Sequence, residues 1–439
     1  MLLGISGFVI IALLMYFLLK GKAIPMTLFV VLPIAAAFLN GFSLTEVAGF
    51  VRKGVSTTWS MAALFVFVIT YFGIMTDVGM FDRLVQKLIK IANGRVFALF
   101  LVVVIVGTLG HLDGNSPTTY LITIPALMPL CKKLHIRIQS VMLVCCAVIT
   151  VMNLVPWGGV LNRQAVTLAM DSGVLWKAYQ PFQIFGLFCC VVLAFIVSRV
   201  EIHHGAGKVD TTGVAEAGAG TTPTVTDAEA QKLLRPKLLW FNATLTVFVF
   251  TLLFMTSLPN YVVFMIGDVF ALIVNYPNVK DQEGRLAAHA PKVISLVATV
   301  LCAGVLVGIF NNTGMITAMA KMIIDIPPAS LNRYLHLVFA FFGGFIGLAV
   351  SPDPLYYGIL PVLIEVCKNY GIPAQSVAIA FGIGADSCFT LAPVIASTYL
   401  GLAVSGLELK DHMKFCFFPL WGLGLVMIAY GCVSGAIVM

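Results

Sequence analysis

The chain has 439 residues, of which 60% are hydrophobic and only 10% are charged, and its mean hydropathy is +1.01. A soluble globular protein carries about 25% charged residues, so this composition excludes one and indicates an all-α polytopic membrane protein. The net charge of +7 does not predict nucleic-acid binding, because the basic residues fall in short segments between apolar runs.

Apolar runs of spanning length occur along the whole chain. The simple ones cover 2–19, 24–40, 59–76, 181–200, 237–257, 260–276, 293–312 and 415–438. Two longer runs, 138–170 and 375–404, each have a helix breaker at the centre, "NLVPWGG" from Asn153 and "FTLAP" from Phe389. We expect each of these to be a discontinuous helix.

Two further runs, 96–131 and 331–368, are interrupted by polar tips, "HLDGNSPTT" and "SPDP". Each predicts a helical hairpin that enters the membrane and turns back. Irregular backbone at that depth is tolerated only where it is buried in protein or lines a cavity.

Two other segments have distinct compositions. Residues 80–93 alternate apolar and basic positions at helical spacing, which predicts an interfacial helix. Residues 201–236 are rich in Gly, Ala and Thr, which predicts a flexible cytoplasmic linker. The linker would divide the chain into an N-terminal transmembrane repeat, 1–200, and a C-terminal one, 237–439.

The two halves are related in sequence. Residues 120–141 and 356–377 align without gaps and share nine identical pairs, from Tyr120 and Tyr356 to Val141 and Val377. Each half then holds five spans and one hairpin. Since five is odd, the second half would lie inverted relative to the first, and inverted repeats with paired broken elements are typical of secondary transporters.

The distribution of basic residues predicts an orientation. If the first hairpin opens to the cytoplasm, 19 of the 26 Lys and Arg residues, Lys292 among them, fall in cytoplasmic segments. This asymmetry fits the positive-inside rule. It predicts a multi-pass protein of the cell inner membrane with both termini outside.

Each hairpin tip has the signature of a helix start. Pro117 and Pro354 suit the first helical position, with Asn115 or Ser116 capping one helix and Asp353 capping the other. Free N–H groups at such helix ends attract anions. The two tips therefore predict a polar binding site within the membrane, supplemented by the exposed backbone groups of the two breaks.

Ionisable residues at membrane depth are costly unless paired, so they are candidates for function. Asp113 and Asp353 lie on the tips and would bind a cation or a proton. Arg163 follows the first break and would hold a carboxylate through its planar guanidinium.

Four other ionisable residues lie in or near the spans. Asp386 precedes the second break and would balance Arg163 or carry a proton. His111 would relay a proton or simply bond a nearby carbonyl. For Asp268 and Glu365 we expect solvation or simple pairing.

Several motifs together resemble one family. They are "DGNSPTTYLITIPALMPLCKKL", "VMNLVPWGGVLNR" and "ASTYLGLAVSGLELKDH", with "YFGIMTDVGMFD" and "LYYGILPVL". They resemble the CitMHS metal–citrate:proton symporters of the ion transporter superfamily, over nearly the whole chain outside the linker. The resemblance implies inverted repeats around one central site, lined by Asp113, Gly114, Thr118, Thr119, Asn153, Gly158, Gly159 and Arg163 from the first half and by Ser351, Asp353, Ser397 and Thr398 from the second.

The chain departs from the family pattern at both tips. Asn115 stands where the family commonly has a second acid, and Pro352 stands within the usual Ser-Asn-Asp tip. Asp386 is the candidate to compensate for the missing acid.

We therefore expect a secondary transporter that imports citrate or a similar polycarboxylate as a divalent-metal complex, coupled to protons by alternating access. A divalent ion lowers the charge of citrate from about −3 to about −1, which reduces the cost of burying it. Hard oxygen ligands suit Mg²⁺ or a similar ion, which would be co-transported, and no permanently bound cofactor is predicted. Spans at the start of each half would form a scaffold and a homodimer contact, while the hairpins and broken helices would move.

Three alternatives remain at this point. A sodium- or proton-coupled carrier of free di- or tricarboxylates would have the same architecture. A metal-dependent intramembrane enzyme needs clustered aspartates, whereas the acids here are isolated. A channel fits two opposed tips less well than alternating access does.

Overall fold

The computed structural model describes residues 2–20, 22–80, 88, 95–207, 232–256, 258–323, 333–393 and 395–438. Within these ranges every regular element is a helix. Most of the predicted interfacial helix at 80–93 and most of the predicted linker at 201–236 lie outside the described residues. At the edges of that linker, α9 continues to His203 and a short 3-10 turn, η1, covers Pro236–Leu238.

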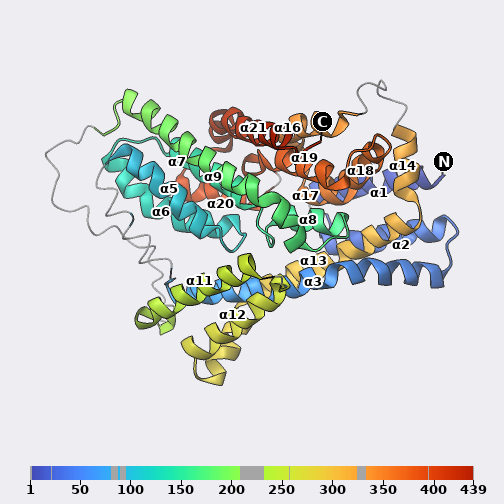
Figure 1. Cartoon of the computed structure of the whole chain (residues 1–439), viewed down its shortest axis with the longest axis horizontal. Helices are drawn as coiled ribbons and strands as arrows, with labels where there is room; N and C mark the ends of the chain where they lie inside the picture. The colour runs from blue at the N-terminus through green and yellow to red at the C-terminus, as the bar shows by residue number, and fades with distance from the viewer. Residues whose placement is uncertain are drawn as a thin grey trace.

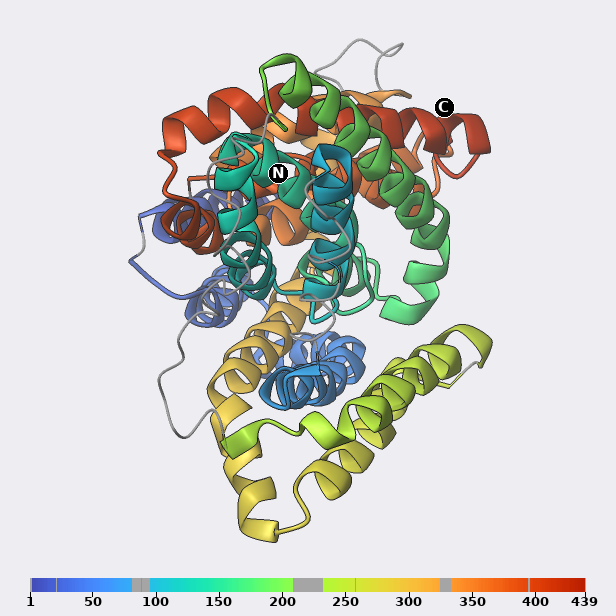
Figure 2. The same ribbon diagram turned by 90° about the vertical axis from the view of Figure 1, so that its left-hand side faces the viewer.

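Two groups of helices make up the molecule (Figure 1). The first, called here the long-helix layer, contains α3 (Leu44–Asp77), α11 (Leu239–Met255), α12 (Asn260–Asn275) and α13 (Val279–Asn312). Figure 2 shows this layer beneath the remaining helices. On one side, α1 (Leu2–Leu19) contacts α14 (Met315–Ile323), and α2 (Pro25–Leu39) packs on α13.

The second group, called here the hairpin layer, contains the segments with polar interruptions. From the first half it takes α5 (Val96–Gly110), α6 (Ser116–Lys133), α7 (Ile138–Met152), α8 (Gly159–Thr167) and α9 (Ser172–His203). From the second half it takes α16 (Leu335–Ala349), α17 (Pro352–Pro354), the π-helical turn η2 (Leu355–Ile359), α18 (Leu360–Lys368), α19 (Ala374–Asp386), the 3-10 turn η3 (Phe389–Leu391), α20 (Ala396–Ser405) and α21 (Leu409–Ser434).

Glycines allow α3 and α13 to pack closely. Gly304 and Gly308 are four residues apart on one face of α13, and Gly54 of α3 lies against both. A Cβ atom added at Gly54 would collide with the Gly304 carbonyl oxygen. Small residues at this spacing let membrane helices approach backbone to backbone, so the two long helices form a firm unit.

Three helices extend beyond the apolar runs from which they were predicted. Helices α3, α9 and α13 begin well before 59, 181 and 293 because each has a polar cap at its true start. Ser43 and Glu46 form a capping box, Asp171 accepts from the amides of Gly173 and Val174, and Asn278 accepts from the amide of Lys280. Hydropathy marks the apolar part of a helix, whereas these caps mark where its hydrogen-bonded turns begin.

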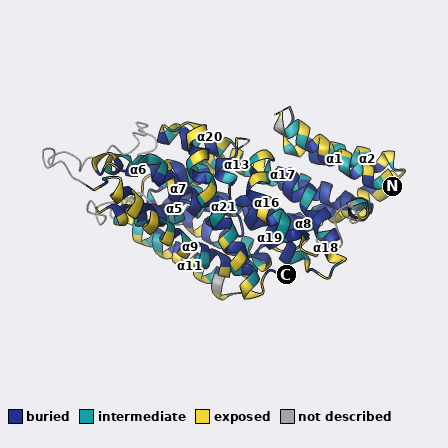
Figure 3. Ribbon diagram, turned by 90° about the horizontal axis from the view of Figure 1, so that it is seen from above, coloured by how far each residue is buried: buried dark blue, intermediate teal, exposed yellow. Residues whose placement is uncertain are grey.

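The helices suit a lipid environment. Among the described residues, six helices are long and apolar enough to cross a membrane, including α3, α9 and α13. Large apolar side chains are exposed on the outer faces of α9 and α11, with Phe188 and Trp240 as examples, while the inner faces are buried (Figure 3). The predicted all-helical membrane fold is confirmed.

Candidate functional site

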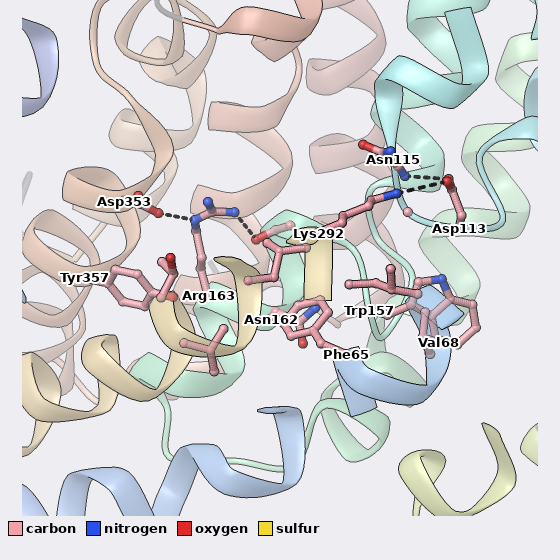
Figure 4. A pocket seen from close by; sticks show the side chains of 16 residues that line it. Phe65, Val68, Asp113, Asn115, Trp157, Asn162, Arg163, Lys292, Asp353 and Tyr357 are labelled. Carbon is pink, nitrogen blue, oxygen red and sulfur yellow. Dashed lines mark hydrogen bonds and ion pairs between the residues drawn. The ribbon is translucent and has the colours of Figure 1, made fainter. Parts of the chain in front are cut away.

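A pocket of about 150 Å³ lies where the two layers meet (Figure 4). Three parts of the chain surround it: one face of α3 and α13, the first hairpin tip with the break that follows it, and the second hairpin tip. The lining residues are Phe65, Val68, Ile69, Asp113, Gly114, Asn115, Trp157, Gly159, Asn162, Arg163, Lys292, Leu296, Thr299, Val300, Asp353 and Tyr357.

The first tip is a tight turn organised by Asp113. One carboxylate oxygen accepts the Asn115 amide at 2.8 Å and the other accepts the Thr118 hydroxyl at 2.8 Å. Gly114 has φ +68°, and a Cβ there would press against Trp157 at 3.1 Å, so only glycine fits without strain. The Trp157 indole N–H also donates to the Leu112 carbonyl at 2.7 Å, which ties the tip to the first break.

The start of α6 differs from the prediction. Asn115 occupies the cap position, but neither its side chain nor that of Ser116 accepts from the helix N–H groups. The side-chain NH₂ group of Asn115 instead donates to the Thr118 hydroxyl at 3.2 Å. Asp113 fixes the turn before α6 instead, because its carboxylate accepts a hydrogen bond from the Asn115 backbone N–H.

The second tip also differs from the prediction. Ser351 holds the cap position and α17 begins at Pro352, so Asp353 is not a cap but lies within the first turn. Its carboxylate is free to turn toward the pocket, where Arg163 Nε donates to it at 2.7 Å. The Ser351 hydroxyl is buried and has no hydrogen-bond partner among the described residues.

Arg163 is held at two points. Besides its ion pair with Asp353, its Nη1 donates to the Gly159 carbonyl one turn earlier in α8, at 2.7 Å. Asp386, predicted either to balance Arg163 or to carry a proton, forms no direct ion pair with Arg163 among the described residues. Asp386 accepts from the Asn153 side chain at 3.2 and 3.4 Å, and Arg163 is occupied by the second tip.

Lys292 is the charged lining residue that the sequence analysis missed. It was assigned to a cytoplasmic segment, but it lies inside α13 with its Nζ 3.7 Å from an Asp113 carboxylate oxygen. The sequence does indicate that Lys292 shares one face of a helix with Leu296, Thr299 and Val300, which follow it at helical spacing. Nothing in the sequence showed that this face would meet the first tip.

Behind the pocket, a chain of buried polar side chains joins the first hairpin, the first break and α19. His111 contacts the Thr119 hydroxyl at 2.8 Å through Nδ1 and the Asn153 side-chain oxygen at 3.0 Å through Nε2. Asn153 then donates to Asp386 at the end of α19. All four side chains are buried, and none lines the pocket. His111 thus bonds a nearby carbonyl oxygen, that of the Asn153 side chain, as its simplest predicted role requires, and it also contacts the Thr119 hydroxyl.

The other predicted residues lie away from the pocket lining. Ser116, Thr118 and Thr119 are in the first turn of α6, behind the tip. Gly158 lies within the first break, where an added Cβ would collide with the Asn153 carbonyl oxygen. Ser397 and Thr398 begin α20, which packs on α6, and the Thr398 hydroxyl donates to the Thr390 carbonyl at 3.3 Å.

Of the two acids expected to be solvated or paired, one is. Glu365 lies 3.7 Å from Lys368 and accepts from Thr317 at 3.4 Å. Asp268 is buried in α12, and its Oδ1 has no hydrogen-bond partner in the described part of the chain, so that expectation was wrong.

The pocket therefore contains two acids and two cations. Across the described ranges, no three His, Cys, Asp or Glu side chains are grouped to hold a metal ion. A tip carboxylate can still contact an ion whose other ligands come with a bound solute, because Mg²⁺ is commonly held by only one or two protein carboxylates.

Comparison with known proteins gives a family and several relatives. Residues 8–384 match the CitMHS family, described as citrate transporters. The chain is 32% identical over 436 residues to a Bacillus subtilis protein named "Citrate transporter", covering 99% of this chain and 100% of that one. It is 31% identical to the "Mg(2+)/citrate complex secondary transporter" of the same organism, with 99% of both chains covered.

Solved structures share the fold at low sequence identity. The YdaH transporter of Alcanivorax borkumensis superposes with a TM-score of 0.61 at 14% identity, covering 89% of each chain. MtrF of Neisseria gonorrhoeae gives a TM-score of 0.54 at 12% identity, covering 90% of this chain and 85% of that one. At this level of identity the likeness concerns the fold alone.

Proposed function

The chain belongs to the CitMHS citrate transporter family, and from that premise we propose that it imports citrate or a similar polycarboxylate as a divalent-metal complex, together with protons. It is a secondary transporter and not an enzyme. The name of one relative, a Mg²⁺/citrate complex transporter, supports the metal complex as substrate.

The observation that carries the proposal is the charge arrangement in the pocket. Asp113 and Asp353 face it from the two tips, and Lys292 and Arg163 are their partners. A metal–citrate complex has the complementary pattern, with one cationic centre surrounded by carboxylates. A tip aspartate suits the metal, and a basic side chain suits the carboxylates.

The incomplete set of acids supports the same substrate. Mg²⁺ takes about six oxygen ligands and is commonly held by only one or two protein carboxylates, which the tips can offer. Citrate supplies further oxygens from its carboxylates and hydroxyl. The metal would therefore enter with the substrate and leave with it, as cargo.

Asp386 supports the proton coupling. It is 2% exposed and bonds the Asn153 amide, with no cation within ion-pair distance among the described side chains. A charge buried in an apolar interior is costly unless paired, so the Asp386 carboxylate is suited to bind a proton. The polar chain through Asn153 and His111 leads from Asp386 to the first tip.

The architecture supports alternating access. We infer that the halves are inverted repeats, that the α5–α6 and α16–α18 hairpins are re-entrant, and that the hairpin layer moves against the long-helix layer. The long-helix layer would also form a homodimer contact, and the exposed apolar faces of α11 and α12 are available for it. Both termini would face outward from the cell inner membrane.

Uptake of labelled citrate into proteoliposomes tests this function. Mg²⁺ and an inward proton gradient should each raise the initial rate, and a chelator should remove the Mg²⁺ effect. Protein-free liposomes and a gradient collapsed with an ionophore are the controls. Citrate uptake that ignores Mg²⁺ would instead support a carrier of free di- or tricarboxylates, and a sodium gradient in place of the proton gradient would identify its coupling ion.

A further inference from the structure

Lys292 differs from every other lining residue on its side of the pocket. The wall built by α3 and α13 consists of Phe65, Val68, Ile69, Lys292, Leu296, Thr299 and Val300. Lys292 is the only charged side chain among them. A lysine on an otherwise uncharged wall, with its side chain directed to the first tip (Figure 4), indicates a specific task.

The contact that Lys292 makes is loose. Its Nζ lies 3.7 Å from Asp113, and 43% of its side chain is exposed. Asp113 already accepts two hydrogen bonds from its own turn, so the tip keeps its shape without the lysine. A lysine ammonium is a mobile point charge that can change partners.

We propose that Lys292 is a substrate-binding residue that exchanges partners: it pairs with Asp113 when no divalent ion is bound, and binds a substrate carboxylate once the metal has taken its place. This inference rests on the proposed function and extends it, since it adds a ligand from the long-helix layer. The metal of the bound complex then takes the place of Lys292 beside Asp113, and a substrate carboxylate takes the place of Asp113 beside Lys292.

The exchange has a structural consequence. Lys292 belongs to α13 of the long-helix layer, and Asp113 belongs to the hairpin layer. Their ion pair therefore joins the two layers directly. When the metal takes Asp113, that tie is replaced by contacts made through the substrate, so the layers are linked through the cargo.

The partner exchange predicts opposite effects on two ligands. In Lys292→Gln, Asp113 no longer has a competing cation, so Mg²⁺ alone should bind about threefold more tightly, the size expected for a half-exposed ion pair. The Mg²⁺–citrate complex should bind about tenfold more weakly, since it loses one charge-assisted contact. Both affinities are measured by isothermal titration of the purified full chain, with MgCl₂ alone and with MgCl₂ plus citrate.

Two further variants control this experiment. Lys292→Arg keeps a positive charge and should retain affinity for the complex within about threefold. Lys410→Gln removes an exposed lysine from the first turn of α21, outside the pocket, and should change neither affinity. A merely structural role of Lys292 would weaken both ligands together in Lys292→Gln.

The two proposals fail in different ways. Parallel changes, or no change, for Mg²⁺ and the complex in Lys292→Gln would overturn the partner exchange. If the unmodified protein bound no Mg²⁺–citrate complex, the proposed function would fail instead. The Mg²⁺-only measurement does not depend on citrate, so unchanged Mg²⁺ affinity in Lys292→Gln would still refute competition between the lysine and the ion.

Discussion

The two ion pairs of the pocket both join an aspartate to a basic side chain, but they differ in geometry and position. Each joins a tip aspartate from one half of the chain to a basic residue from the other. Arg163 and Asp353 are 2.7 Å apart, both belong to the hairpin layer, and Arg163 is also tied to Gly159. Lys292 and Asp113 are 3.7 Å apart and belong to different layers. The tight pair shapes the pocket, whereas the loose pair is the one that can respond to a ligand.

Breaking the tight pair should have the largest effect. Arg163→Gln leaves Asp353 without its partner, and removing one member of a buried pair destabilises a protein by about 3–5 kcal/mol. We expect citrate uptake to fall at least about 100-fold, with a lower melting temperature. Initial uptake rates and thermal unfolding in detergent measure both. Arg163→Lys, which keeps the charge but loses the planar fork, should lose less of each; equal losses would contradict a role for the fork.

Changing the acid of the loose pair should have a smaller effect. Asp113→Asn retains an oxygen that can accept the Asn115 amide, so the turn survives, but the carboxylate charge is lost. Affinity for Mg²⁺–citrate should fall about tenfold, as expected for one charge-assisted contact, with little change in melting temperature. Titration calorimetry on the purified protein checks this, and full coupled uptake by Asp113→Asn would refute the assignment.

Asp386 extends the comparison to an acid that has no basic partner among the described side chains. Asp386→Asn keeps the contact with Asn153 in altered form but cannot release a proton. We expect the stimulation of uptake by a proton gradient to disappear while Mg²⁺-dependent binding remains. Proteoliposome uptake with and without the gradient measures this effect. Stimulation equal to that of the unmodified protein would place the proton site elsewhere.

The smallest expected effect concerns the support of the loose pair. Trp157→Phe removes the hydrogen bond to the Leu112 carbonyl and should lower the free energy of unfolding by about 1 kcal/mol. The Mg²⁺–citrate affinity should change less than in Asp113→Asn. Denaturation and calorimetry together check this order, which would be reversed if Trp157 itself contacted the substrate.

The sequence predicted the features that depend on local chemistry. Proline and glycine marked the breaks after Met152 and Asp386, and the polar tips marked the turns near Asp113 and Asp353. Each of these motifs spans only a few residues, so it can be recognised in the sequence without knowledge of the packing. The sequence also identified Asp113 and Asp353 on the tips and Arg163 after the first break, and the structure places all three in one pocket.

Features that depend on packing were not predictable in this way. The family resemblance implied that Ser397 and Thr398 line the site, yet both lie outside the pocket lining. Lys292 resembled any basic residue near the end of an apolar run, because its role depends on how α13 lies against the first tip. The pairing of Asp386 with Asn153 likewise joins residues far apart in the chain.

The central claim is that the two tips act on one substrate, and a double-mutant cycle tests it most directly. Asp113→Asn, Asp353→Asn and the double variant are titrated with the Mg²⁺–citrate complex. If both tips contact the same bound complex, the effects on binding free energy should be non-additive by about 0.5–3 kcal/mol. Effects that add within about 0.5 kcal/mol would mean that the tips act independently, and would contradict a shared site.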